Sequence, residues 1–278
     1  MYYFNMLKYS TGIVPVLMKP IMAPFLRKGK GMLLAYDQGL EHGPSKDFNE
    51  KSVDPAYILE IAEKGNFTGI IFQKGVAEKY YDGKTPLVIK VNGKTSLPKG
   101  EPIASQICSV KQAKDLGAKA VGYTIYLGSA YENLMLHEFG KIQQEAHELG
   151  LAAITWIYPR GEAVTNDTAP EIVAYAARAG LEVGADAIKI KYTGDSDSFK
   201  WAVRSAGAAK VFMSGGPKAP TDEAFLKQVK GAIDAGATGL AVGRNVWQHE
   251  RPLEMAAALR EIILNGQSVD AALKKFTR

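Results

Sequence analysis

The sequence predicts an α/β protein of the (β/α)8, or TIM-barrel, class, folded as a single domain with a short N-terminal extension. The chain has 278 residues, and one such barrel needs about 250. Hydrophobic residues make up 46% and charged residues 23%, the ordinary mix of a globular protein with a large core. Short apolar runs alternate with amphipathic helical segments, which is typical of βαβ units and a parallel sheet. Eight such units without a second domain favour a closed barrel over an open sheet.

Eight short apolar runs are the expected strands. Six of them lie at 70–72, 121–123, 151–156, 187–189, 211–213 and 240–242, each after a glycine: Gly65, Gly117, Gly150, Gly184, Gly207 and Gly236. Glycine suits the left-handed residue that ends a helix, because it has no Cβ to clash. Two further runs, 32–36 and 87–91, lack this junction. None of the runs alternates with polar residues, so strands buried on both faces are expected.

Apolar residues recur at helical spacing in four longer segments, 53–64, 131–149, 171–183 and 223–235. We expect residues 31–265 to form the barrel, residues 1–30 to form an N-terminal arm or helix packed on it, and residues 266–278 to carry a short C-terminal helix. The apolar stretch 12–26 is interrupted by Pro15, Lys19, Pro20 and Pro24. It is therefore too broken for a membrane span, and no clear signal peptide is present.

Composition excludes several function classes. The net charge is 34 − 29 = +5, an excess that could favour anionic substrates but lacks the dense basic stripe of a nucleic-acid binder. The single cysteine, Cys108, excludes an internal disulfide framework and a multi-cysteine zinc site, and it fits a reducing cytoplasm. The four histidines are scattered. We therefore expect neither a metal nor a cofactor, and no nucleic-acid or membrane partner.

Two lysines stand out on the sixth expected strand. Lys189 and Lys191 are two residues apart and share a face, whereas Ile188 and Ile190 suit the contact with the helices. Both lysines should therefore point into the barrel, where burial and a second cation lower a lysine pKa. A neutral lysine can attack a carbonyl to form a Schiff base. Alternatively, both ammonium groups pair with carboxylates.

Other polar side chains follow strand ends, where barrel enzymes carry their chemistry. Trp156, Tyr158 and Arg160 close the fifth strand, and Tyr158 should lie beside Lys189. The phenol could carry a proton or simply fill the barrel. Asp37, after the first strand, could order a hydroxyl, carry a proton or cap a turn. His42 could be a proton carrier, a phosphate contact or an ordinary loop histidine.

A phosphate site is expected where the seventh and eighth strands end. Ser214, Gly215 and Gly216 follow one strand, and Gly243 and Arg244 follow the other. Paired glycines let backbone amides approach an anion closely, and a short helix after Gly243 presents its N-terminus. Loops at these two positions form the common phosphate site of this fold. The alternative is a pair of ordinary glycine turns.

Five motifs resemble those of archaeal-type class I fructose-bisphosphate aldolase. They are AYD at 35–37, EHGP at 41–44, AIKIKYTGD at 187–195, MSGGPK at 213–218 and AVGRNVWQ at 241–248. The resemblance covers about 28–263. It implies a metal-independent Schiff-base lyase that reversibly cleaves fructose 1,6-bisphosphate to dihydroxyacetone phosphate and glyceraldehyde 3-phosphate in glycolysis and gluconeogenesis, often as a decamer.

Within this resemblance, Lys189 matches the Schiff-base lysine, Tyr158 the proton carrier and Asp37 the aspartate of the first strand. Trp156 matches a substrate-side aromatic, and the phosphate loops match Ser214–Gly216 and Gly243–Arg244. His42, Arg160 and Lys191 are further substrate-binding candidates, Lys191 as the cation that keeps Lys189 neutral. Gln38 departs from the pattern, because family members often carry histidine there, and residues 1–27 have no clear counterpart.

Three alternative functions are considered. A sister family, the transaldolase-type 2-amino-3,7-dideoxy-D-threo-hept-6-ulosonate synthases, shares the lysine and the YPRG and YTGD motifs. Trp156 and the EHGP motif look more like the aldolase. A barrel sugar-phosphate isomerase would explain the phosphate loops but not two inward lysines. A non-catalytic phosphate-binding protein would also leave Tyr158 and Asp37 unexplained.

Overall fold

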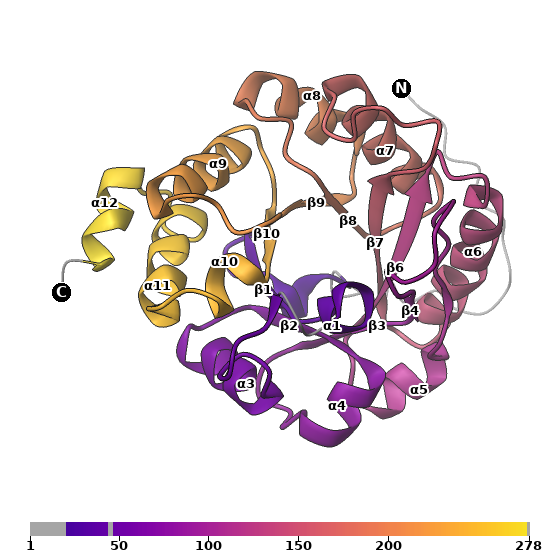
Figure 1. Cartoon of the computed structure of the whole chain (residues 1–278), viewed down its shortest axis with the longest axis horizontal. Coiled ribbons are helices and arrows are strands. Elements are labelled where there is room, and N and C mark those ends of the chain that lie inside the picture. Colours follow the sequence, from indigo (N-terminus) through magenta and orange to yellow (C-terminus); the bar gives the residue numbers. More distant parts are fainter. Residues whose placement is uncertain (1–20, 44–46, 277–278) are drawn as a thin grey trace, which may run out of the picture.

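Eight parallel strands close into a barrel surrounded by helices (Figure 1). The computed structural model describes residues 21–43 and 47–276. The strands are β1 (Gly31–Ala35), β2 (Gly69–Gln73), β3 (Leu87–Lys90), β6 (Ala120–Leu127), β7 (Ala152–Pro159), β8 (Ala187–Ile190), β9 (Lys210–Ser214) and β10 (Gly239–Val242). They follow the order β1-β10-β9-β8-β7-β6-β3-β2 around the barrel. The predicted (β/α)8 fold and all eight predicted strands are confirmed.

The helices lie outside the strands, except for the short ones at the barrel mouth. They are α1 (Gln38–His42), α3 (Pro55–Lys64), α4 (Lys74–Tyr80), α5 (Val110–Asp115), α6 (Glu132–Glu148), α7 (Pro170–Glu182), α8 (Ser196–Ser205), α9 (Asp222–Asp234), α10 (Arg244–Trp247), α11 (Pro252–Ile263) and α12 (Val269–Leu273). The four longer predicted helices are confirmed. Several begin at a side-chain cap, as at Asp54, Asp195 and Thr221, whose oxygens accept backbone N–H bonds.

Apolar side chains form two layers. The outer layer lies between strands and helices and includes Ile188 and Ile190, as their spacing predicts. The inner layer fills the barrel and includes Phe25, Phe212 and Trp156. Phe25 belongs to the 3-10 helix Ala23–Phe25, which comes before β1, and it is fully buried. The barrel is therefore packed below its carboxyl end, and free space remains at the mouth, where the polar residues lie.

Three local features differ from the sequence prediction. Asp37 is followed by the short helix α1, which was not among the helices expected from the sequence. A small antiparallel pair, β4 (Asn92–Gly93) with β5 (Ser105–Gln106), extends the connection after β3. At the first helix-to-strand junction, Asn66 takes the positive φ of 53°, whereas Gly65 is right-handed. A Cβ at Gly65 would crowd the Ile61 carbonyl, so this glycine is needed for close approach.

Some sequence predictions fall outside the described residues. These are the part of the N-terminal arm formed by residues 1–20, and Pro44 of the EHGP motif. Among the helices of the described chain, none has the length and apolar character needed to cross a bilayer.

Candidate active site

A cavity of about 190 Å³ opens at the carboxyl ends of the strands. Every site residue predicted from the sequence lines it: Asp37, His42, Trp156, Tyr158, Arg160, Lys189, Lys191, Ser214, Gly215, Gly216, Gly243 and Arg244. These residues come from five strand ends and from the two short helices α1 and α10, which lie inside the ring of longer helices (Figure 1). The structure therefore brings the whole predicted set together, and the roles of its members remain predictions.

Lys189 is the buried amine of this cavity. It lies on β8 between Ile188 and Ile190, which face the helices, and its side chain is only 6% exposed. Burial lowers the pKa of the Lys189 amine, because an ammonium loses its hydration there. The carboxylates of Asp37 and Glu41 oppose this shift, and Arg244 adds to it. The net direction is down, so a larger fraction of Lys189 is neutral and nucleophilic near neutral pH.

Trp156 separates two buried lysines. It is the direct register partner of Lys189 in the β7–β8 pairing, so it, rather than Tyr158, lies beside the amine. The Lys189 Nζ lies 5.2 Å from the indole centroid, and the Lys90 Nζ lies 5.6 Å from the same ring. Gly122 on β6 makes room for the ring, since any Cβ there would collide with it. The indole therefore extends across β6 towards β3 and contacts both amines through cation–π interactions.

Lys90 is a site residue that sequence reasoning missed. It ends β3, its side chain is 3% exposed, and it interacts with the charges of Asp37, Glu41 and Lys189. Burial lowers the pKa of its amine, and the two carboxylates counteract this. One sequence signal was present, because a lysine at the end of an otherwise apolar strand is costly to bury without a partner. Lys90 is therefore the second buried amine of the barrel.

Asp37 and Glu41 supply negative charge beside the two amines. Asp37 does not cap a turn: its side chain makes no capping bond, and its buried Oδ1 has no hydrogen-bond partner within the described residues. Glu41 accepts a 2.6 Å hydrogen bond from the Tyr126 hydroxyl and lies 3.4 Å from Arg160. Burial raises the pKa of Glu41, but Lys90 and the Tyr126 hydroxyl outweigh it, and the net pKa is lowered. Glu41 is therefore ionised, and Asp37 keeps an oxygen free for a ligand.

Tyr158 is a half-buried phenol two residues nearer the mouth than Trp156. Its hydroxyl lies 3.2 Å from the Ser214 Oγ, so it reaches across β8 to the end of β9. Burial raises the pKa of this phenol well above its usual value, and the nearby carboxylates act in the same direction. The group therefore stays protonated across the neutral range. A protonated phenol in a cavity is suited to donating a proton to a reacting atom.

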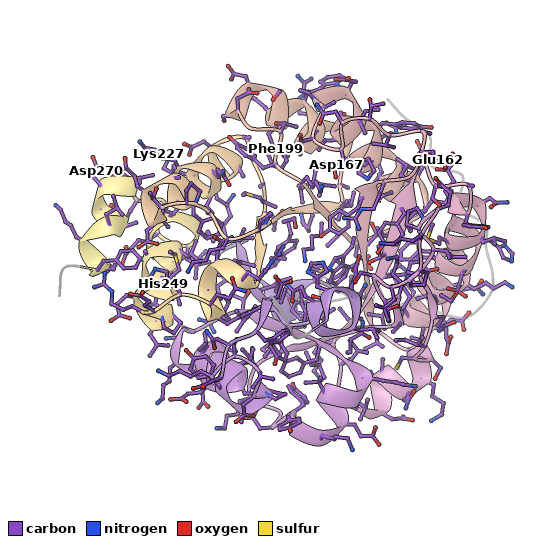
Figure 2. All side chains as sticks on the ribbon, in the orientation of Figure 1. Glu162, Asp167, Phe199, Lys227, His249 and Asp270 are labelled. Atoms are coloured by element: carbon purple, nitrogen blue, oxygen red, sulfur yellow. The ribbon has the colours of Figure 1, made fainter. Side chains whose placement is uncertain are left out.

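Lys191 was predicted to point into the barrel, but it does not. β8 ends at Ile190, and the Lys191 ammonium turns to the carboxylate of Asp167 on the connection between β7 and α7. Figure 2 labels Asp167 and shows it among the side chains between α7 and α8. Side chains two residues apart share a face only within a strand, and β8 ends one residue before Lys191. The shared face predicted for Lys189 and Lys191 therefore does not form. Lys191 still lines the cavity rim, but it is not the buried cation beside Lys189.

The two expected phosphate loops lie next to each other. Asn245 of α10 joins them: its amide donates to the carbonyls of Gly215 and Pro217, both at 2.8 Å, and its oxygen accepts from the Ala219 N–H. The Gly215 N–H is already bonded to the Ala241 carbonyl at 3.0 Å. Gly215 also packs closely against Val242 of β10. Its N–H is thus engaged within the protein, and its part in binding a phosphate stays a prediction.

Arg244 supplies the positive charge at these loops. Its NH1 lies 3.3 Å from an Asp47 carboxylate oxygen. Its Nε is buried and has no hydrogen-bond partner in the part of the chain that the structure describes. A guanidinium with an unused donor in a cavity is suited to binding a phosphate oxygen.

Groups that could hold a metal are not found: across the described residues, no three His, Cys, Asp or Glu side chains gather as potential ligands. Cys108 is buried, its thiol contacts the Ser109 carbonyl at 3.4 Å, and burial raises the thiol pKa. A thiol in this state is a poor nucleophile. The cavity itself is lined by amines, carboxylates, guanidinium groups and a phenol.

Comparison with known proteins assigns the chain to a class of aldolases. Residues 31–249 match the DeoC/LacD family aldolase description, and the chain belongs to this family. Within it, the chain is similar to "Fructose-bisphosphate aldolase class 1" of Thermoproteus tenax, with 56% identity over 247 residues, 88% of this chain and 94% of the relative. The protein of the same name from Halobacterium salinarum is 45% identical over 259 residues, 91% of this chain and 98% of the relative.

A solved structure shows the same fold. It is an archaeal fructose-1,6-bisphosphate aldolase whose catalytic lysine is covalently bound to the carbinolamine intermediate of the substrate. It is 54% identical, has a TM-score of 0.86, and the match covers 89% of this chain and 99% of that one.

Proposed function

We propose that this protein is a Schiff-base aldolase that reversibly cleaves fructose 1,6-bisphosphate to dihydroxyacetone phosphate and glyceraldehyde 3-phosphate. The observation that carries the proposal is the buried Lys189, whose pKa is lowered by burial, in a cavity that also holds a protonated phenol and a free guanidinium donor. Support also comes from the class 1 aldolases at 56% and 45% identity.

An assay of product formation tests the proposal. The purified protein is mixed with fructose 1,6-bisphosphate, and the two triose phosphates are followed with coupling enzymes. Equal amounts of both products are expected. A transaldolase-type synthase would need a second substrate before it turned over, and an isomerase would give no triose phosphate. Either of these results would contradict the proposal.

In the first half of the reaction, the neutral Lys189 amine attacks the ketone carbon of the substrate. The carbinolamine that forms loses water to give an iminium, and Asp37, with an oxygen free of partners, supplies and accepts the protons of these steps. The iminium is an electron sink, so it performs the task that a Lewis-acid metal performs in other enzymes.

In the second half, the bond between carbons three and four breaks. Asp37 takes the proton of the carbon-four hydroxyl, glyceraldehyde 3-phosphate leaves, and the bonding electrons move into the iminium to give an enamine. Tyr158 then donates its proton to carbon three of the enamine, since burial keeps this phenol protonated. Water adds to the resulting iminium, and dihydroxyacetone phosphate is released with Lys189 regenerated as the amine. The proton that Asp37 took from the hydroxyl returns to the Tyr158 phenolate through water, so both groups start the next cycle in their original states.

Two positions can hold the two phosphates of the substrate. Arg244, Ser214 and Gly216 surround one end of the cavity. At the other end, Arg160 also lines a neighbouring cavity of about 490 Å³, together with Lys94 and Lys99. These three cations outnumber the two carboxylates of the same cavity, Glu101 and Glu162. The net positive charge can hold a second phosphate, which supports a bisphosphate substrate.

We assign the task of keeping Lys189 neutral to Lys90 instead of Lys191. Lys90 contacts the same indole as Lys189 and is surrounded by the same carboxylates. When it is charged, it disfavours a second ammonium beside it, and it balances Asp37 and Glu41, which would otherwise favour one. We propose that both effects hold the pKa of Lys189 down, in addition to the burial and the Arg244 charge that lower it.

Changing Lys90 to methionine should therefore raise the pKa of Lys189. The neutral form of Lys189 carries the activity above its pKa and is lost as the pH falls through it. A higher pKa moves the acid limb of kcat/KM to higher pH, by about one pH unit or more. The pH profile of kcat/KM between pH 5 and 9 checks this. In Lys191→Met, which removes the partner of Asp167, the acid limb should stay in place. If the limb moves in Lys191→Met and stays in place in Lys90→Met, Lys191 is the cation that keeps Lys189 neutral.

Removal of metals should leave the activity intact. After dialysis against excess EDTA, the rate of fructose 1,6-bisphosphate cleavage should stay within about twofold of the untreated rate, because the iminium supplies the electron sink. Loss of cleavage that zinc then restores would show a metal-dependent aldolase instead.

Assembly and location complete the proposal. We expect a homo-oligomer, a decamer by resemblance, in the cytoplasm. Support comes from Tyr175 on α7 and Trp201 on α8, which are 64% and 59% exposed on neighbouring helices and would be covered by another copy. Light scattering on the purified protein measures the number of copies.

A further inference from the structure

Asp47 joins the two short helices at the cavity mouth. One carboxylate oxygen lies 2.7 Å from the Nδ1 of His42, at the end of α1, and the other lies 3.3 Å from the NH1 of Arg244, at the start of α10. The backbone carbonyl of Asp47 also accepts a hydrogen bond from the Gln248 side chain, just after α10. A single residue outside the cavity lining thus contacts two residues that line it.

The backbone at Asp47 is fixed by its neighbour. Phe48 stacks on Trp247 of α10 with a centroid distance of 5.2 Å and an interplanar angle of 18°, and it meets Tyr36 edge-on at 5.3 Å. The Trp247 indole in turn donates to the Ala35 carbonyl at the end of β1. The Asp47 side chain is only 15% exposed. It therefore differs from a mobile surface ion pair, which contributes little.

The contacts of Asp47 leave the opposite side of each partner available. Because a carboxylate only accepts, Nδ1 of His42 carries the proton, and the Nε2 of this cavity-lining ring is not used by Asp47. Asp47 bonds to NH1 of Arg244 only, while the buried Nε of Arg244 has no partner among the described residues. Arginine binds phosphate best with two donors in a fixed orientation, and holding the guanidinium in advance lowers the entropy lost on binding.

We propose that Asp47 is a positioning residue for the phosphate group of the substrate, acting through Arg244 and His42 without touching the ligand. This inference rests on the proposed function for its choice of ligand. A carboxylate near a phosphate also repels it, but the Arg244 guanidinium already offsets the charge of Asp47, and His42 adds a hydrogen bond. Positioning therefore outweighs repulsion, and removal of the carboxylate weakens phosphate binding.

The test compares Asp47→Ala and Asp47→Asn with a matched control. Asp186 forms the same kind of pair with His147, at 2.9 Å and with 18% of its side chain exposed, but it precedes β8 at the opposite end of the barrel. In Asp47→Ala, the dissociation constant for inorganic phosphate, measured by calorimetry, and the KM for fructose 1,6-bisphosphate should both rise about tenfold, because a misplaced Arg244 would lose one charge-assisted hydrogen bond to the phosphate. In Asp47→Asn the rise should be smaller, and in Asp186→Asn neither constant should change.

A second measurement distinguishes a loss of phosphate positioning from a general loss of the active-site structure. Borohydride reduction traps the Schiff base with dihydroxyacetone phosphate and with plain dihydroxyacetone. Asp47→Ala should slow trapping of the phosphorylated ketone at low concentration and leave the plain ketone unaffected, with kcat within about threefold. Equal loss with both ketones, unchanged phosphate affinity or tighter phosphate binding would overturn the proposal. Phosphate calorimetry needs no turnover, so a wild-type protein inactive towards fructose 1,6-bisphosphate would refute the proposed function and leave this inference testable.

Discussion

Replacing Lys189 with methionine should reduce the cleavage of fructose 1,6-bisphosphate to less than about a hundredth of the wild-type rate. Methionine fills a similar volume but cannot attack a carbonyl, and losing a covalent nucleophile usually costs far more than a hundredfold. The fold should remain, because the change removes a buried amine that burial already disfavours as a charge. Initial rates and thermal unfolding of the two proteins check both expectations.

Lys191→Met is the matched control for this experiment. It removes a lysine two residues further on that lines the same cavity but pairs with Asp167. Its kcat should fall far less than that of Lys189→Met. If Lys189→Met keeps more than about a hundredth of the rate, the nucleophile lies elsewhere.

Replacing Tyr158 with phenylalanine should slow proton exchange at carbon three of dihydroxyacetone phosphate by about a hundredfold or more, the usual effect of losing a general acid or base. The phenol is the protonated group assigned to the enamine carbon. Exchange in deuterated water, followed by proton NMR, measures this step directly. Schiff-base formation should persist, because Lys189 is unchanged.

Tyr123→Phe provides the control. Tyr123 is a buried tyrosine on the neighbouring strand β6, and its hydroxyl donates to Glu138 at 2.6 Å, outside the cavity. Exchange in this variant should match the wild type. If exchange in Tyr158→Phe stays within about threefold of the wild type, another group carries the proton, and Asp37 becomes the first candidate.

The barrel could be predicted because its signals are local and repeated. Gly117, Gly150, Gly184, Gly207 and Gly236 all have positive φ at the helix-to-strand junctions, as their positions predict. The unalternating strands follow from burial on both faces. The site could be located in the same way, because the fold places strand ends together, and polar residues at those ends stand out against the apolar runs.

The remaining features depend on contacts that no local pattern contains. The orientation of Lys191 depends on the residue at which β8 ends and on Asp167, which is 24 positions earlier. The importance of Lys90 depends on Trp156 extending across Gly122, a contact between three strands. Asp47 reaches Arg244 across 197 positions. Such pairings are set by tertiary packing, so the sequence indicated the residue types but not their partners.

Borohydride trapping with dihydroxyacetone phosphate, followed by peptide mass mapping, tests the central claim most directly. An iminium at Lys189 would be reduced to a stable secondary amine. The account predicts one adduct per chain on the peptide that contains Lys189, absent in Lys189→Met and retained in Lys191→Met. In Lys90→Met the adduct should still map to Lys189, although it forms only at higher pH. An adduct on Lys90 or Lys191, or no adduct while the protein is turning over fructose 1,6-bisphosphate, would contradict the account.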